Sequence, residues 1–181
     1  MRKRHLVLLL LPLLAACQPQ TSPAPAAAPS TTAAAPAGGA VETTEQERDA
    51  VLATIQGFMD ALRTKDTAAM SQQVDSLTRL TLIRPTREGG TRVLVMTGAQ
   101  FIQAVTQPGQ PGLDEPIRNP VVHVSGDLAT VWAEYQVRRD DNTVSHCGFD
   151  AFHLVRKDGR WKLLNISDTY QQTGCGPAWP R

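Results

Sequence analysis

Residues 120–170 read PVVHVSGDLATVWAEYQVRRDDNTVSHCGFDAFHLVRKDGRWKLLNISDTY, and this stretch decides the fold. Its segments 128–138, 144–156 and 161–170 are rich in apolar and β-branched residues and are separated by short polar turns. Asp158-Gly159 is a strong signal for a two-residue hairpin, because both central positions of a type I′ turn need positive φ. With a shorter strand at 120–124 that turns back at 125–127, the stretch predicts an antiparallel meander.

The residues before the meander carry helix signals. Thr44 and Glu47 fit a capping box, which starts a helix that runs to about residue 63. Its apolar residues recur every three or four positions and form one stripe: Val51, Ile55, Phe58, Met59 and Leu62. Asp66 or Thr67 can cap a short second helix that ends near residue 74, and Thr97 can cap a third.

Two further strands are expected at 77–83 and 92–96, on either side of the Gly89-Gly90 turn. Helices that pack on one curved sheet give an α+β domain. The loop at 107–120 holds four prolines and two glycines and is long for a compact domain, so it is a candidate pocket rim or lid. An ordinary solvent-exposed loop is the alternative.

The Asp158-Gly159 turn also predicts the pairing of its two strands. A two-residue loop places Asp150 opposite Ser167 and Phe152 opposite Asn165, with all four side chains on one face. Val131, Ala133, Tyr135 and Val137 join this more apolar face if the next turn is even in length, and we assign it to the interior. The other face is a candidate dimer surface and carries Trp132, Glu134, Phe149, His153, Leu164 and Ile166. A single bulge would reverse the assignment of the strand that contains it.

Several runs together resemble the NTF2-like superfamily, which includes SnoaL-like proteins and bacterial proteins labelled lumazine-binding. These runs are Ile117-Arg118-Asn119-Pro120, 126–132, His146-Cys147-Gly148, Asp150-Ala151-Phe152 and 158–162. The resemblance implies a cone in which a curved antiparallel sheet wraps a long N-terminal helix around a pocket, often as a dimer through the sheet. Because the superfamily includes isomerases, dehydratases, ligand carriers and adaptors, the fold does not supply the chemistry.

Asp150 is the candidate catalytic residue. Burial in an apolar cone disfavours the ionised carboxylate and raises its pKa, which suits proton transfer near neutral pH. Tyr135, Phe152, Asn165 and Ser167 complete the candidate ligand-binding set, in which the polar groups orient a carbonyl. The alternative is an ionised, structural Asp150 held by hydrogen bonds.

The sequence gives little indication of a metal or cofactor. His123, His146 and His153 do not have the spacing of a familiar zinc motif, so we expect neither metal nor cofactor. Trp132 and Trp161 could stack a planar ligand, although such residues more often fill a core.

The N-terminus resembles a bacterial lipoprotein signal. Residues 1–16 carry Arg2, Lys3 and Arg4 and then a short apolar run that ends in Leu14-Ala15-Ala16-Cys17. This resemblance implies transfer of a diacylglyceryl group to the Cys17 thiol, cleavage before Cys17 and acylation of the new amino terminus with a fatty acid such as palmitate. Gln18 favours the outer membrane facing the periplasm, by the same resemblance. An ordinary secretory signal followed by a chance cysteine is the alternative. Residues 17–42 form a tether that is rich in Ala and Pro, and 43–181 form the domain.

The net charge bears on the class of binding partner, and the cysteines predict a disulfide. Loss of the signal leaves 15 of the 18 basic residues against 17 acidic ones, a net charge of −2, which argues against a nucleic-acid binder. Once Cys17 is lipidated, Cys147 and Cys175 are the two thiols left in an oxidising compartment, and we predict that they pair. A reactive thiol is the alternative.

Two functions fit these observations. One is a membrane-anchored, non-catalytic module that binds a small apolar or planar molecule or an envelope protein. The other is a lyase or isomerase with Asp150 as general base and Tyr135 or Asn165 polarising the substrate. The second function requires Asp150 to lie in the cavity without a salt bridge to an arginine.

Overall fold

A computed structural model describes residues 43–139 and 141–180. The predicted signal, the tether and Cys17 lie outside this range and stay predictions. Within the described residues, no helix is both long enough and apolar enough to cross a membrane.

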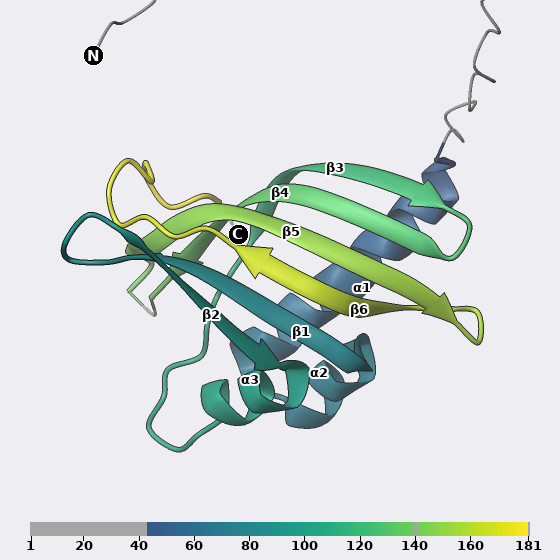
Figure 1. Ribbon diagram of the computed structural model, residues 1–181, viewed down its shortest axis with the longest axis horizontal. Helices are drawn as coiled ribbons and strands as arrows, with labels where there is room; N and C mark the ends of the chain where they lie inside the picture. Colours follow the sequence, from purple (N-terminus) through teal and green to yellow (C-terminus); the bar gives the residue numbers. More distant parts are fainter. Residues whose placement is uncertain (1–42, 140, 181) are drawn as a thin grey trace, which may run out of the picture. The chain divides into compact units, whose positions relative to one another are not determined.

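Three helices and six strands make up the domain, in the order α1 (Glu45–Thr64), α2 (Thr67–Gln73), β1 (Val74–Pro85), β2 (Thr91–Thr97), α3 (Gly98–Val105), β3 (Ile117–Ser125), β4 (Leu128–Arg138), β5 (Val144–Lys157) and β6 (Arg160–Asp168). The strands form one sheet in the order β2-β1-β6-β5-β4-β3. Strand β1 runs parallel to β6, whereas every other pairing is antiparallel. The curved sheet and the helix that crosses it, visible in Figure 1, form the cone expected from the sequence.

Helix α1 lies across one face of the sheet because its predicted apolar stripe is buried there. Val51 and Ile55 are fully buried and belong to the same core cluster as Val131 of β4 and Phe152 and Leu154 of β5. We call this face of the sheet the interior face and the opposite one the outer face. Burial of one stripe of a helix against one face of a sheet supplies most of the stability of such a layer.

The predicted caps form. The Thr44 hydroxyl accepts a hydrogen bond from the Glu47 amide at 3.2 Å, although the Glu47 carboxylate accepts from that hydroxyl instead of reaching back to the cap amide. Asp66, rather than Thr67, caps α2. Thr97 and Gln100 form a full capping box at α3.

Strand β3 begins earlier than predicted, at Ile117 instead of residue 120. The strand is irregular near its start, with a register shift between Arg118 and Val121 and a positive φ of 51° at Asn119. The prolines and glycines around this point made the sequence look like a loop. The Asp158-Gly159 turn has the predicted positive φ at both positions, 51° and 72°.

One prediction of register is wrong beyond the first pairs of the β5–β6 hairpin. Leu154 pairs with Leu163 as expected, but His153 pairs with Asn165, so Leu164 is an extra residue in β6. A bulge of one residue reverses which side chains face inward. Asp150 therefore lies opposite Asp168, and Phe152 lies opposite Ile166, instead of opposite Ser167 and Asn165.

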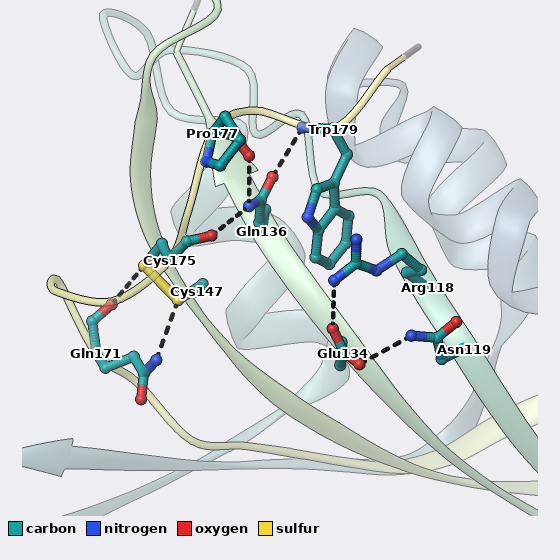
Figure 2. A network of polar contacts seen from close by, with 9 residues as sticks. All are labelled: Arg118, Asn119, Glu134, Gln136, Cys147, Gln171, Cys175, Pro177 and Trp179. Atoms are coloured by element: carbon teal, nitrogen blue, oxygen red, sulfur yellow. Dashed lines mark hydrogen bonds and ion pairs between the residues drawn. A yellow bond between two sulfur atoms is a disulfide. The ribbon is translucent and has the colours of Figure 1, made fainter.

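The C-terminal tail folds back over the outer face of β4 and β5. Cys147 and Cys175 form the predicted disulfide with Cα atoms 5.6 Å apart. Figure 2 shows the tail held by Gln136, whose side-chain amide donates to the Cys175 and Pro177 carbonyls at 2.7 and 3.1 Å and accepts from the Trp179 amide at 3.1 Å. The Trp179 ring stacks on Arg118, with the guanidinium carbon 4.2 Å from the ring centre.

Candidate functional site

A cavity of about 230 Å³ lies between α1, α3 and the interior face of the sheet. Its apolar wall consists of Phe58, Met59, Leu62, Leu80, Leu82, Phe101, Leu113, Val137 and Ile166. Its polar groups gather on the sheet and the loop before β3, and they are Arg84, Glu115, His146, Asp150, Asp168 and Tyr170. An apolar cavity with a few convergent polar groups is typical of a small-molecule site.

Asp150 is the buried polar group at this site. Its residue surface is only 1% exposed, and its Oδ2 atom has no hydrogen-bond partner among the described residues. Burial raises the pKa of the Asp150 carboxyl well above its usual range, the negative charges of Glu115 and Asp168 raise it further, and Arg84 opposes them. These effects favour the protonated carboxyl, which can donate a hydrogen bond, whereas the carboxylate can only accept one.

The neighbouring carboxylate of Asp168, unlike that of Asp150, has a hydrogen-bond partner for each of its oxygens. Arg84 of β1 holds it with two parallel bonds, Nη1 to Oδ1 at 2.6 Å and Nη2 to Oδ2 at 2.7 Å. Among the described residues that line the cavity, Arg84 is the one arginine or lysine. The Arg84 guanidinium pairs with Asp168 and forms no salt bridge with Asp150.

Glu115 enters the cavity from the loop before β3. Burial raises the pKa of its carboxyl to about 8, together with the charge of Asp168, and Arg84 opposes both effects. Leu113 and Glu115 make this loop part of the cavity wall, as the predicted pocket rim requires. Glu115 and Met59 also line a larger, polar hollow of about 730 Å³, which therefore adjoins the cavity.

His146 and two tyrosines complete the polar surroundings. Burial, aided by the positive charges of Arg84 and Arg139, lowers the pKa of His146 to about 4, so its imidazole is neutral at pH 7. Its ring lies 4.6 Å from that of Tyr170 and 5.9 Å from that of Tyr135. Burial also raises the pKa of the Tyr135 hydroxyl, which keeps it protonated.

The structure brings together only part of the predicted ligand-binding set. Asp150 lines the cavity, whereas the Tyr135 hydroxyl donates to the Thr169 carbonyl at 2.6 Å and Phe152 is fully buried in the core. Asn165 and Ser167 lie on the outer face, where the Asn165 amide donates to the Ser167 hydroxyl at 2.9 Å. The bulge at Leu164 causes this displacement, and it brings Ile166 into the cavity wall instead of the outer face.

The two tryptophans considered for stacking lie outside the cavity lining. Trp161 is a core residue that packs under the Arg156 guanidinium, 4.7 Å from the ring centre. Trp132 is half exposed on the outer face and stacks on Phe149 with ring centres 5.2 Å apart, on the surface predicted for them.

Sequence reasoning missed Arg84, Glu115 and Asp168. The alternation of Leu80, Leu82 and Arg84 places them on one face of β1, but the parallel pairing with β6 that brings Arg84 to Asp168 has no local sequence signal. In the described part of the chain, no group of three His, Cys, Asp or Glu side chains is arranged to hold a metal ion.

The six-stranded curved sheet with α1 across its interior face defines the NTF2-like cone fold. Similar solved structures include a protein with a cystatin-like fold from Nostoc punctiforme (TM-score 0.59, 14% identity, 73% of this chain and 96% of the other). An NTF2-like protein from Cytophaga hutchinsonii is also similar, with a TM-score of 0.56 and 17% identity over 69% of this chain and 98% of the other. A third is a proposed dehydratase of the NTF2-like family from Streptomyces avermitilis, with a TM-score of 0.54 and 14% identity over 68% of this chain and 95% of the other.

Within this fold, the chain belongs to the SnoaL-like domain family, whose sequence profile matches residues 51–167. No curated protein sequence matches the chain. At these identities the solved structures establish the fold, and the chemistry has to be argued from the cavity.

Proposed function

We propose that the domain binds a compact small molecule in the cavity next to Asp150, without transforming it. The proposal rests on a largely apolar cavity of about 230 Å³ and on a buried carboxyl in its wall whose Oδ2 atom has no hydrogen-bond partner among the described residues. A buried polar atom without a partner costs about 1–3 kcal/mol, and a ligand that pairs with it recovers this free energy. The cavity is smaller than the usual range for drug-sized ligands, which favours a compact molecule.

A filled-cavity variant tests this proposal. Leu82 lines the cavity, so Leu82→Trp occupies its volume, whereas Val95 on the neighbouring strand is 64% exposed and Val95→Trp is the matched control. Native mass spectrometry of protein purified from its own cells should detect a bound small molecule in the parent and in Val95→Trp but not in Leu82→Trp. Equal occupancy in both variants would place binding elsewhere and contradict the proposal.

A lyase or isomerase is the second candidate. It is favoured by the position of Asp150, which lies in the cavity and has no salt bridge to Arg84, because Arg84 pairs with Asp168. A carboxyl with a raised pKa suits proton transfer near neutral pH. The neutral imidazole of His146 and the ring of Tyr170 also face the cavity, and they replace Asn165 and Ser167 as candidate polarising groups.

Hydrogen exchange distinguishes the two candidates. An enzyme that uses Asp150 as general base should exchange the α-protons of a bound ketone for deuterium in D₂O, and Asp150→Asn should abolish this exchange. Binding of the same ketone without exchange above the rate in buffer would eliminate the enzyme and leave the binding function intact.

The predicted lipid anchor places this domain in the bacterial envelope, on the periplasmic side of the outer membrane. The support is the sequence of residues 14–17 and the charge-free tether, in which nine Ala and five Pro occupy 14 of the positions 17–41. Several acyl chains make membrane attachment stable, whereas one alone is marginal. Cys17→Ser should therefore move the protein from the membrane fraction to the soluble fraction, and an unchanged distribution would contradict the anchor.

A further inference from the structure

Acidic side chains outnumber basic ones among the described residues that line the cavity. Three carboxyl groups, those of Glu115, Asp150 and Asp168, face one guanidinium among the described lining residues, and Asp168 occupies both outer nitrogens of that guanidinium. Asp150 is 1% exposed, so water cannot easily take the place of a counter-charge. Within the part of the chain that the structure describes, Asp150 is thus a buried acidic group with no cation paired to it.

From this imbalance we infer that the cavity takes a small organic cation, an ammonium group on a compact apolar body, whose positive charge pairs with Asp150. The inference rests on the proposed binding function and names its ligand class. A metal ion is a poorer candidate, because the described residues contain no arrangement of three suitable side chains to hold one.

The remaining wall of the cavity suits such a cation. Phe58 and Phe101 line it with stacked rings whose centres are 6.2 Å apart, and Tyr170 adds a third aromatic ring. Tyr170 already faces one cation, since the Arg84 guanidinium carbon lies 5.2 Å from its ring centre. Aromatic faces attract alkylammonium groups by about 0.5–2 kcal/mol, more as the site is desolvated.

The affinity for a cation should depend on pH, because binding is linked to loss of protons from the cavity. The groups that face Asp150 are Arg84 on β1, Tyr135 on β4, His146 on β5, Asp168 on β6 and Glu115 on the loop. Burial raises the pKa of Asp150 and of Glu115, so at any pH below these pKa values a cation must displace a proton before it gains a carboxylate partner. Affinity for a cation should therefore rise with pH, whereas affinity for a neutral molecule of the same shape should not.

Two probe molecules of the same shape, one charged and one neutral, measure the effect of the positive charge on binding. Phenyltrimethylammonium and tert-butylbenzene have the same heavy-atom skeleton, and the charge of the former does not titrate. We expect the cation to bind the full mature domain more tightly, with a preference of about tenfold that increases between pH 6 and pH 9, as measured by competition with a fluorescent dye. Asp150→Asn should remove the preference, and Asp49→Asn, the same change on the exposed surface of α1, should leave it unchanged.

The outcomes separate this inference from the proposed function. If tert-butylbenzene binds as well as the cation at every pH and Leu82→Trp blocks it, the cavity binds ligands but the cation inference is overturned. If neither probe binds and native mass spectrometry also finds no ligand, the proposed function fails as well. If Asp150→Asn unfolds, the pH profile of the parent serves as the second measurement, and a preference for the cation that does not change between pH 6 and pH 9 would overturn the inference.

Discussion

Gln136 and Asp150 lie on neighbouring strands and are equally buried, at 0% and 1% exposure, but on opposite faces of the sheet. The side-chain amide of Gln136 makes three hydrogen bonds to the C-terminal tail. The Oδ2 atom of Asp150 makes none to the described residues. A buried polar group with all its partners specifies a structure, whereas one without partners costs stability and needs another explanation. The outer-face network of Gln136 therefore stabilises the tail, and the unpaired Oδ2 atom of Asp150 supports the binding function that we propose for the interior face.

The largest expected effect follows from removing the disulfide that fixes the tail on the outer face. The Cys147→Ser, Cys175→Ser double variant should lower the free energy of unfolding by about 3 kcal/mol, because the bridge closes a loop with a sequence separation of 28 residues. Chemical denaturation of the oxidised parent and the variant measures this difference. A change within experimental error would mean that the bridge does not form in the protein as purified.

Replacement of Gln136 should have the next largest effect. Gln136→Leu removes three hydrogen bonds and leaves two carbonyls and one amide of the tail without partners, which should cost about 2 kcal/mol. Gln103→Leu on the exposed side of α3 is the matched control and should stay within about 0.5 kcal/mol of the parent. If both variants unfold at the same denaturant concentration, the tail network does not stabilise the domain.

Asp150→Asn should act with the opposite sign. The folded state holds the proton of Asp150 more tightly than the unfolded chain does, so stability falls as pH rises above the ordinary pKa of an aspartate. The amide variant avoids this loss and should be more stable than the parent by about 1 kcal/mol at pH 8, with a smaller gain toward pH 4. Thermal unfolding at several pH values measures the trend, and a destabilised variant at pH 8 would show that Asp150 is a paired, structural carboxylate.

The smallest effect on stability is expected on the exposed part of the outer face. Trp132 and Phe149 stack on each other there at 50% and 41% exposure. Trp132→Ala should change the stability of the monomer by less than about 1 kcal/mol and leave ligand binding unchanged. Because this surface is a predicted dimer interface, the variant should also shift sedimentation toward the monomer. An unchanged sedimentation profile of a dimeric parent would place the interface elsewhere.

Local signals predicted much of this fold from the sequence. The caps Thr44 and Thr97, the Asp158-Gly159 turn and the alternation along β4 act within a few residues, so they can be recognised without a structure. The interior position of Val131, Ala133, Tyr135 and Val137 follows from the same alternation, and all four are buried.

The candidate site was less predictable because it depends on non-local pairing. The bulge at Leu164 reverses the inward alternation of β6, and neither Leu164 nor its neighbours carry a glycine or another bulge signal. The approach of Arg84 to Asp168 requires the parallel pairing of β1 with β6, which joins segments 84 residues apart in the chain. Asp150 was recognisable because the alternation within β5 places it on the same face as Phe152 and Leu154, and the bulge in β6 does not change that alternation.

Asp150 is a buried carboxyl whose Oδ2 atom has no hydrogen-bond partner among the described residues. A pH titration of the Asp150 side-chain carboxyl carbon by NMR, with Asp150→Asn to assign the signal, tests it most directly. We expect a titration midpoint well above the ordinary range of an aspartate in the ligand-free domain, and a lower midpoint when phenyltrimethylammonium is bound. A ligand-free midpoint at or below the ordinary range would show that Asp150 is ionised and satisfied by the protein, and would contradict the account.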